Sequence, residues 1–100
     1  MSTRASIKFT EEDETFFVYR HCDGNPEIIL PDIQSVIEKT RRRWAEPEVG
    51  LLTTAFLGFM FDPNRRIQNY EITSCIHGDE SYEYVVAWFA EEKRWKVTVL

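Results

Sequence analysis

The stretch from Val49 to Phe61, VGLLTTAFLGFMF, constrains the fold of this chain more than any other. Thr53 and Thr54 carry its only polar side chains, and a segment this apolar is typical of a helix that is buried on most sides. The stretch is shorter than the about 20 apolar residues that a membrane-spanning helix needs. We therefore expect the rest of the chain to pack around a buried helix at 49–61.

Local signals support both ends of this helix. Pro47 and Glu48 suit a first helical turn, where a missing N–H costs nothing and negative charge is favoured. Asp62 precedes Pro63, and a residue before proline is disfavoured in the helical region. Small residues at positions 50, 54 and 58 form a stripe that would let another helix or a sheet approach closely.

Composition indicates one folded domain spanning residues 1–100, because the chain is 43% hydrophobic and 14% aromatic. Its net charge of −5 lacks the basic footprint of a nucleic-acid binder, so direct nucleic-acid binding is disfavoured. Cys22 and Cys75 have no metal-ligand spacing, which predicts free thiols and no zinc site. No secretion signal opens the sequence, and we expect a cytoplasmic protein.

Two strands at 5–10 and 15–21 are expected at the start of the chain, joined by an acidic loop. An amphipathic helix is predicted from Pro31 to Trp44, with Glu27–Leu30 as a lead-in turn. Three further strands at 70–76, 82–90 and 94–100, separated by short polar turns, predict an antiparallel meander.

The predicted order is ββααβββ, a two-layer α+β domain in which a helical hairpin packs on a five-stranded antiparallel sheet. The second face of that sheet would stay uncovered. Val85 and Phe89, together with Leu100, would point away from the helices. Exposed apolar area of this sort often marks a partner surface.

Two histidines lie near acidic residues, in Tyr19–Gly24 and in the segment His77-Gly78-Asp79-Glu80. Together they could supply a metal cluster or a Cys–His pair. The predicted topology, however, places His21 and His77 at opposite ends of a strand, roughly 20 Å apart. Separately, the second segment is typical of a hairpin turn and the first of a strand-to-helix corner. We predict no metal site, and no known cofactor motif is present.

Arginines near the same predicted sheet edge allow two interpretations. Arg20, Arg65 and Arg66 could hold a phosphate, with His21 transferring a proton and Asp23 orienting its ring. This defines the enzymatic alternative, a small phosphoesterase or nucleotide-binding protein. In the other interpretation the arginines form surface ion pairs with acidic neighbours. Two interpretations also apply to Arg41, Arg42 and Arg43. They could form a phosphate site, or they could interact favourably with the dipole at a helix C-terminus.

Four segments resemble a group of small uncharacterised proteins encoded in bacterial genomes, prophages and mobile elements: Phe17–Gly24, Trp44–Gly50, Phe56–Gly58 and Ile76–Tyr82. The resemblance brings no catalytic residues with it. It implies a setting in which compact acidic proteins often block host proteins.

A patterned core without a coherent catalytic constellation favours a protein-binding module over an enzyme. We expect an unidentified protein partner, no cofactor and no membrane association. The contact surface would include Val85 and Phe89, and it could be completed by homodimerisation through an edge strand.

Overall fold

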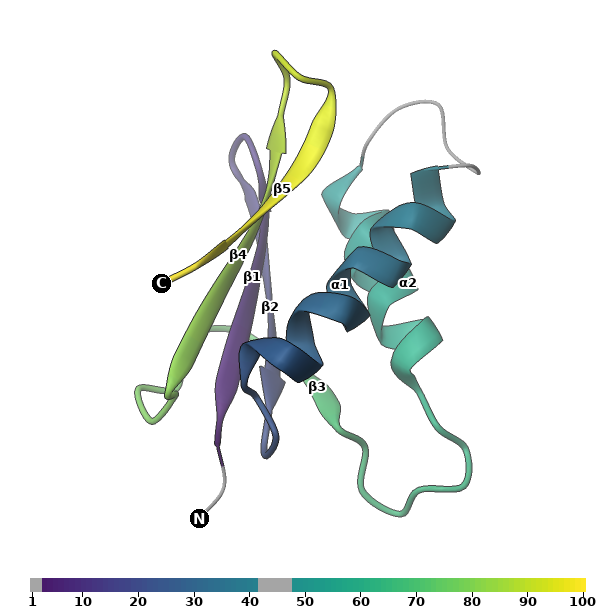
Figure 1. Cartoon of the computed structure of the whole chain (residues 1–100), viewed down its shortest axis with the longest axis vertical. Helices are drawn as coiled ribbons and strands as arrows, with labels where there is room; N and C mark the ends of the chain where they lie inside the picture. Colours follow the sequence, from purple (N-terminus) through teal and green to yellow (C-terminus); the bar gives the residue numbers. More distant parts are fainter. Residues whose placement is uncertain (1–2, 42–47) are drawn as a thin grey trace.

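The computed structural model describes residues 3–41 and 48–100. It has two layers, with both helices on one face of a five-stranded sheet (Figure 1). The elements are β1 (Ala5–Glu11), β2 (Glu14–Arg20), α1 (Pro26–Arg41), α2 (Val49–Met60), β3 (Tyr70–Thr73), β4 (Tyr82–Phe89) and β5 (Arg94–Val99). The predicted α+β class and the order ββααβββ are confirmed.

The prediction of an antiparallel sheet is wrong, because the sheet is mixed. Its strand order is β3-β2-β1-β4-β5, and β1 pairs with β4 in parallel from Ala5↔Tyr82 to Thr10↔Ala87. The other three pairings are antiparallel. The predicted meander of the last three strands is also wrong, since β3 pairs with β2, which leaves a single hairpin of β4 and β5.

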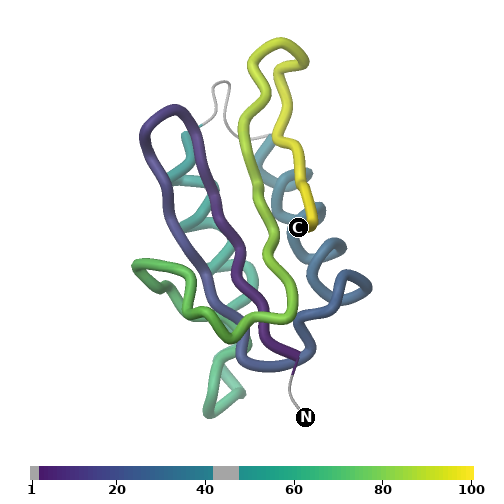
Figure 2. Tube along the Cα trace, turned by 90° about the vertical axis from the view of Figure 1, so that its left-hand side faces the viewer, coloured from purple at the N-terminus to yellow at the C-terminus, as the bar shows by residue number. Residues whose placement is uncertain are grey.

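The connection from β3 to β4 explains both errors. Residues 74–81 do not form a tight turn but run across the open face of the sheet, over β2 and β1, to reach the far side of β1 (Figure 2). A connection of this length can cross two strands, whereas the turn formers at Gly78 and Asp79 resemble those of a hairpin. We call residues 74–81 the crossover.

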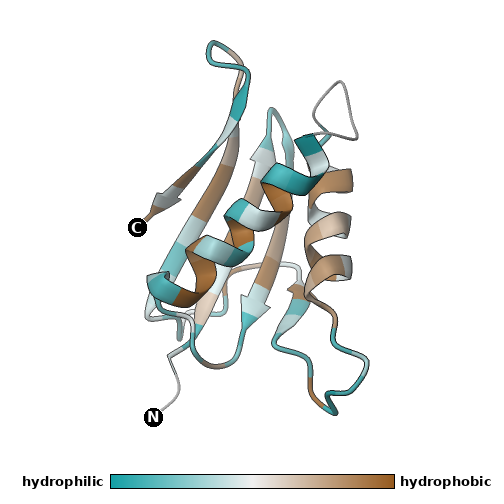
Figure 3. Ribbon diagram, turned by 45° about the vertical axis from the view of Figure 1, so that its right-hand side comes forward, coloured by the Kyte–Doolittle hydropathy of each residue, from teal (hydrophilic) through white to brown (hydrophobic). Residues whose placement is uncertain are grey.

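Helix α1 begins at Pro26, five positions before the predicted start at Pro31, which lies inside the helix. The carbonyl of Asn25 accepts the first helical bonds, from the amides of Ile28 and Ile29. Figure 3 shows the predicted amphipathic character, with a hydrophilic outer side. The predicted helix end at 42–44 and the connection through residues 45–47 lie outside the described residues.

Helix α2 confirms the predicted element at 49–61 but not its burial on most sides. Val49, Leu52, Thr53 and Phe56 are buried, whereas Leu51 and Phe59 are each 41% exposed. The small-residue stripe allows no unusually close approach: a Cβ added at Gly50 would make ordinary contact with the Phe16 ring at 3.9 Å, and one added at Gly58 would meet nothing within 4 Å. A helix in the outer layer of a two-layer domain keeps one side towards water. On α2 that side carries Leu51, Thr54, Gly58 and Phe59, and the helix is coloured in brown and pale bands in Figure 3.

The N-terminus of α2 is held by an acidic side chain from the first hairpin. Its N-cap residue, Glu48, makes no side-chain cap, but Glu11 Oε1 accepts a hydrogen bond from the Val49 amide at 3.1 Å. A carboxylate at this position satisfies an unpaired N–H and interacts favourably with the helix dipole. The acidic segment after β1 therefore contributes to the packing of α2.

The core lies between the helices and the facing side chains of the central strands. Phe56 of α2 is fully buried, with its ring centre 5.4 Å from that of Phe9 and 4.8 Å from that of Tyr70. Tyr84 is also fully buried, and its hydroxyl donates to the Gly24 carbonyl at 2.7 Å. Burial raises the pKa of Tyr84 to about 12, assisted by the charges of Tyr82 and Glu27.

The turn between β2 and α1 requires a glycine. A Cβ on Gly24 would lie 2.6 Å from the Cβ of Ala5, closer than side-chain atoms approach. The Gly24 amide donates to the Thr3 carbonyl at 2.8 Å, so its backbone packs directly against the start of β1. Among the described helices, none combines the length and apolar character needed to cross a bilayer.

Two phenylalanines of α2 provide a matched test of this packing. Phe56→Ala should lower the free energy of unfolding by about 3–5 kcal/mol, because it leaves a cavity among buried rings. Phe59→Ala should cost less than about 1 kcal/mol, since that ring is partly in water. Urea unfolding measures both, and equal losses would contradict the assigned orientation of α2.

Candidate functional site

Arg20 and His21 are neighbours in sequence, but the structure does not bring them together in one site. Arg20 is 5% exposed on the helix-facing side, where its Nε donates to the Cys22 carbonyl at 2.6 Å. Its guanidinium lies 3.7 Å from an Asp32 oxygen and 4.8 Å from the Tyr70 ring centre. His21 is exposed and lies 2.9 Å from a Glu71 oxygen. Arg20 is therefore a structural cation of the core.

The other residues of the predicted phosphate site are exposed. Asp23 has a left-handed backbone conformation with φ of 56° at the β2–α1 corner. Arg65 and Arg66 lie in the segment between α2 and β3, and neither forms an ion pair with the described residues. Without Arg20, the structure does not assemble the predicted five-residue site. Arg41 pairs with Glu38, while Arg42 and Arg43 lie outside the described residues.

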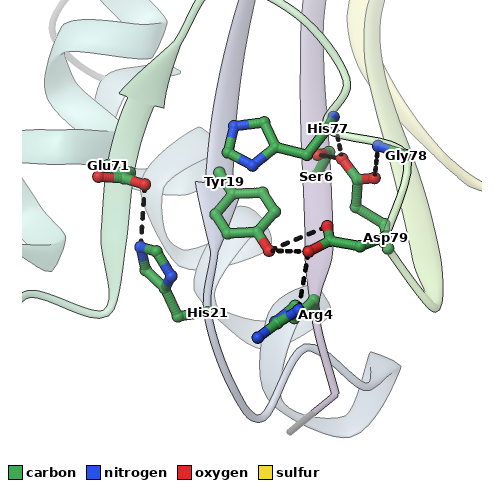
Figure 4. A network of polar contacts seen from close by, with 9 residues as sticks. Arg4, Ser6, Tyr19, His21, Glu71, His77, Gly78 and Asp79 are labelled. Atoms are coloured by element: carbon green, nitrogen blue, oxygen red, sulfur yellow. Dashed lines mark hydrogen bonds and ion pairs between the residues drawn. The ribbon is translucent and has the colours of Figure 1, made fainter.

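The expected separation of His21 and His77 is wrong, because both rings contact Tyr19 (Figure 4). The His77 ring stacks on Tyr19 at 3.9 Å between centres, and the His21 ring meets it edge-on at 4.8 Å. The expected distance between His21 and His77 follows from placing β3 in a meander, where it would carry His77 to the far end of the sheet. In the structure β3 lies beside β2, and the crossover then carries His77 back over Tyr19.

Two carboxylates of the crossover bind the sheet beneath it. Asp79 accepts the Tyr19 hydroxyl at 3.0 Å and pairs with Arg4 at 2.8 Å. Glu80 accepts the hydroxyl of Ser6 on β1, and it also accepts the amides of His77 at 2.9 Å and Gly78 at 2.6 Å. Ser6 and Tyr19 are buried beneath this connection. We call these contacts the crossover network.

The crossover network is arranged to hold the chain in place. Burial and the nearby Asp79 carboxylate raise the pKa of the Tyr19 phenol, so it stays protonated and acts as a donor. Asp79 and Glu80 are already occupied by donors from the chain. Among the described residues, no group of three or more His, Cys, Asp or Glu side chains could hold a metal ion. Cys22 and Cys75 are free thiols.

Val85 and Phe89 lie on the sheet face opposite the helices. Their neighbours in β4, Tyr84 and Val86, are fully buried on the helix side, and side chains alternate along a strand. Val85 is half-buried, and Phe89 is 39% exposed with the Lys96 ammonium 3.9 Å from its ring centre.

A second apolar surface, which the sequence did not reveal, surrounds β3. A cavity of about 150 Å³ opens between the end of α2 and this strand. It is lined by Leu57, Met60, Phe61, Gln68, Tyr70, Glu71 and Ile72. Two of these lining residues are exposed, Phe61 at 59% and Ile72 at 65%. We call Phe61 and Ile72 the edge patch, because Ile72 belongs to β3, an edge strand of the described sheet.

Gln68 organises the segment that frames this cavity. Its Oε1 accepts the Asp62 amide at 2.9 Å, and its Nε2 donates to the carbonyls of Asp62 at 2.8 Å and Arg65 at 3.2 Å. These bonds fold the chain after α2 into a defined loop.

The crossover network predicts a pH effect on stability. Partial burial would raise the pKa of Glu80, but hydrogen bonds from Ser6 and from backbone amides outweigh it and hold the pKa below its ordinary value of 4.5. A lowered folded-state pKa gives stability that is present above pH 4.5 and is lost as the pH falls through the folded-state value.

Glu80→Gln should therefore lower stability by about 1 kcal/mol near neutral pH, and this difference should shrink under acid conditions. Thermal unfolding across the acid range measures it. Glu91→Gln, on the exposed β4–β5 turn, serves as the control and should change little. A Glu80→Gln effect that is constant with pH would contradict the role given to this carboxylate.

Comparisons with protein-family models, with curated proteins and with solved structures find no match for this chain.

Proposed function

We propose that this chain is a protein-binding module that contacts its partner through the edge patch and the adjoining cavity. The observation that carries the proposal is the exposure of two large apolar side chains, Phe61 and Ile72, in the lining of one cavity at the open edge of the described sheet. Contiguous exposed apolar area is uncommon on monomers and often marks an interaction site. Burial against a partner would remove this area from water.

The chemistry of the cavity favours binding over catalysis. Four of its seven lining residues are apolar: Leu57, Met60, Phe61 and Ile72. The Tyr70 hydroxyl donates to Asp32 at 2.7 Å, so its polar end is already engaged. Burial and the Asp32 carboxylate raise the pKa of Tyr70, which keeps this hydroxyl protonated. Such a lining suits an apolar side chain.

The resemblance to proteins of mobile elements makes a host-cell protein the first partner class to test, with blocking or modulation of that protein as the outcome of binding. The open sheet face with Val85 and Phe89 is a second proposed contact surface. It adjoins the crossover, whereas the edge patch lies on the helix side of β3.

Substitution of Ile72 provides a direct test of the proposed partner surface. Ile72→Lys should abolish most partner capture from a bacterial lysate without lowering the melting temperature by more than a few degrees, because this side chain is already largely in water. Val99→Lys changes an exposed apolar residue of the opposite edge strand, β5, and should leave capture unchanged. Quantitative mass spectrometry of the captured proteins gives the readout. Equal capture by wild type and Ile72→Lys would refute the proposed surface.

A further inference from the structure

We infer that the edge patch binds an extended peptide segment, which adds to the sheet beside β3 and carries an apolar side chain next to a carboxylate. The inference rests on the proposed protein-binding function and names the form and chemistry of the partner. It depends on three features of the described residues: an open strand edge, a cavity beside it and two unpaired cations.

The open edge supplies backbone groups. β3 pairs with β2 from Phe17↔Thr73 to Arg20↔Tyr70, and no described strand pairs with its other side. An added strand would hydrogen-bond to this side, as in recognition by strand addition. Alternate side chains of that strand would point to the helix side, where Tyr70 and Ile72 border the cavity.

The volume of the cavity limits the size of the apolar side chain that the peptide can insert. An apolar cavity of roughly 150 Å³ can accommodate a molecule as large as benzene. The space between α2 and β3 therefore suits one aliphatic or aromatic side chain. Met60 is an adaptable part of the cavity lining, because its unbranched thioether side chain can fill irregular gaps.

Arg65 and Arg66 indicate that the bound segment carries negative charge. Both are exposed and form no ion pair with the described residues. The loop that carries them is bonded to Gln68, a residue of the cavity wall. Two adjacent exposed cations can pair with Asp or Glu side chains of a partner. Glu71, the acid among the residues that line the cavity, lies 2.9 Å from the His21 ring nitrogen.

A second copy of the chain fits this surface less well than a peptide. The edge strand has only four residues and the cavity takes one side chain, which is small beside the about 1,200 Å² that stable interfaces bury. A second copy would also bring the same net charge of −5 and the same pair of arginines.

The test begins with a random twelve-residue peptide library displayed on phage, selected against the full chain. Enriched peptides should share an apolar residue close to Asp or Glu. The tightest of them is then synthesised with a fluorescent label, and its affinity is measured by anisotropy at several salt concentrations. Failure to enrich any such sequence would overturn the inference.

Three variants locate the bound peptide. Ile72→Lys should weaken binding at least tenfold, and the double variant Arg65→Glu/Arg66→Glu should weaken it about tenfold and flatten its salt dependence. Lys93→Glu, an exposed cation on the β4–β5 turn, should change neither. Loss of binding with Lys93→Glu, or none with Ile72→Lys, would place the peptide elsewhere and overturn the inference.

Backbone methylation separates strand addition from a purely side-chain contact. Peptides methylated at single amide nitrogens should lose affinity at every second position, because alternate N–H groups of an added strand face β3. Uniform tolerance would overturn strand addition. A concentration-dependent dimer that Ile72→Lys dissociates would assign the edge to a second copy and also overturn the inference.

These outcomes remain distinct from the lysate experiment. If lysate capture depends on Ile72 while peptide binding does not, the protein-binding function stands and the extended-peptide inference fails. If capture is insensitive to Ile72, the proposed function itself fails.

Discussion

The parallel pairing of β1 with β4 is the constraint on which the rest of the structure depends. It places β1 at the centre of the sheet, with β2 on one side and β4 on the other. Because β3 lies at the far edge beside β2, the chain must pass over two strands before β4 can begin. The crossover, its carboxylate contacts and the burial of Ser6 and Tyr19 all follow from that path.

Side chains alternate between the two faces of the sheet along β2, so neighbouring polar residues lie in different surroundings. Arg20 points to the helices and is held by the Cys22 carbonyl, Asp32 and the Tyr70 ring, whereas Tyr19 lies under the crossover. A cluster of polar residues that looks continuous in the sequence is thereby divided between two faces. The other two arginines of the predicted site, Arg65 and Arg66, are exposed in the loop between α2 and β3, where the Arg65 carbonyl accepts a hydrogen bond from Gln68 of the cavity wall.

Local patterns in the sequence predicted the number, type and order of the elements, because periodicity and turn residues report local structure. They did not predict strand pairing. The turn-like residues from His77 to Glu80 suited a hairpin equally well, and only long-range contacts with Ser6 and Tyr19 distinguish the crossover from it. For the candidate site, the sequence indicates Arg65 and Arg66 but groups them with Arg20, which the structure buries on the helix side of the sheet. It does not indicate the edge patch, because the exposure of Ile72 depends on β3 being an edge strand.

The parallel pairing also has a consequence during protein synthesis. The hairpin of β1 and β2 can form early and pairs Ala5 with Arg20, but the other side of Ala5 has no partner until Tyr82 has been made, and such distant pairing is slow. Until then one side of β1 is open to pairing with another nascent chain. Lys8 sits at the middle of that strand, facing away from the helices, between Phe17 and Val85. A positive charge there discourages intermolecular strand pairing, so this residue can protect the growing chain from aggregation before the sheet is complete.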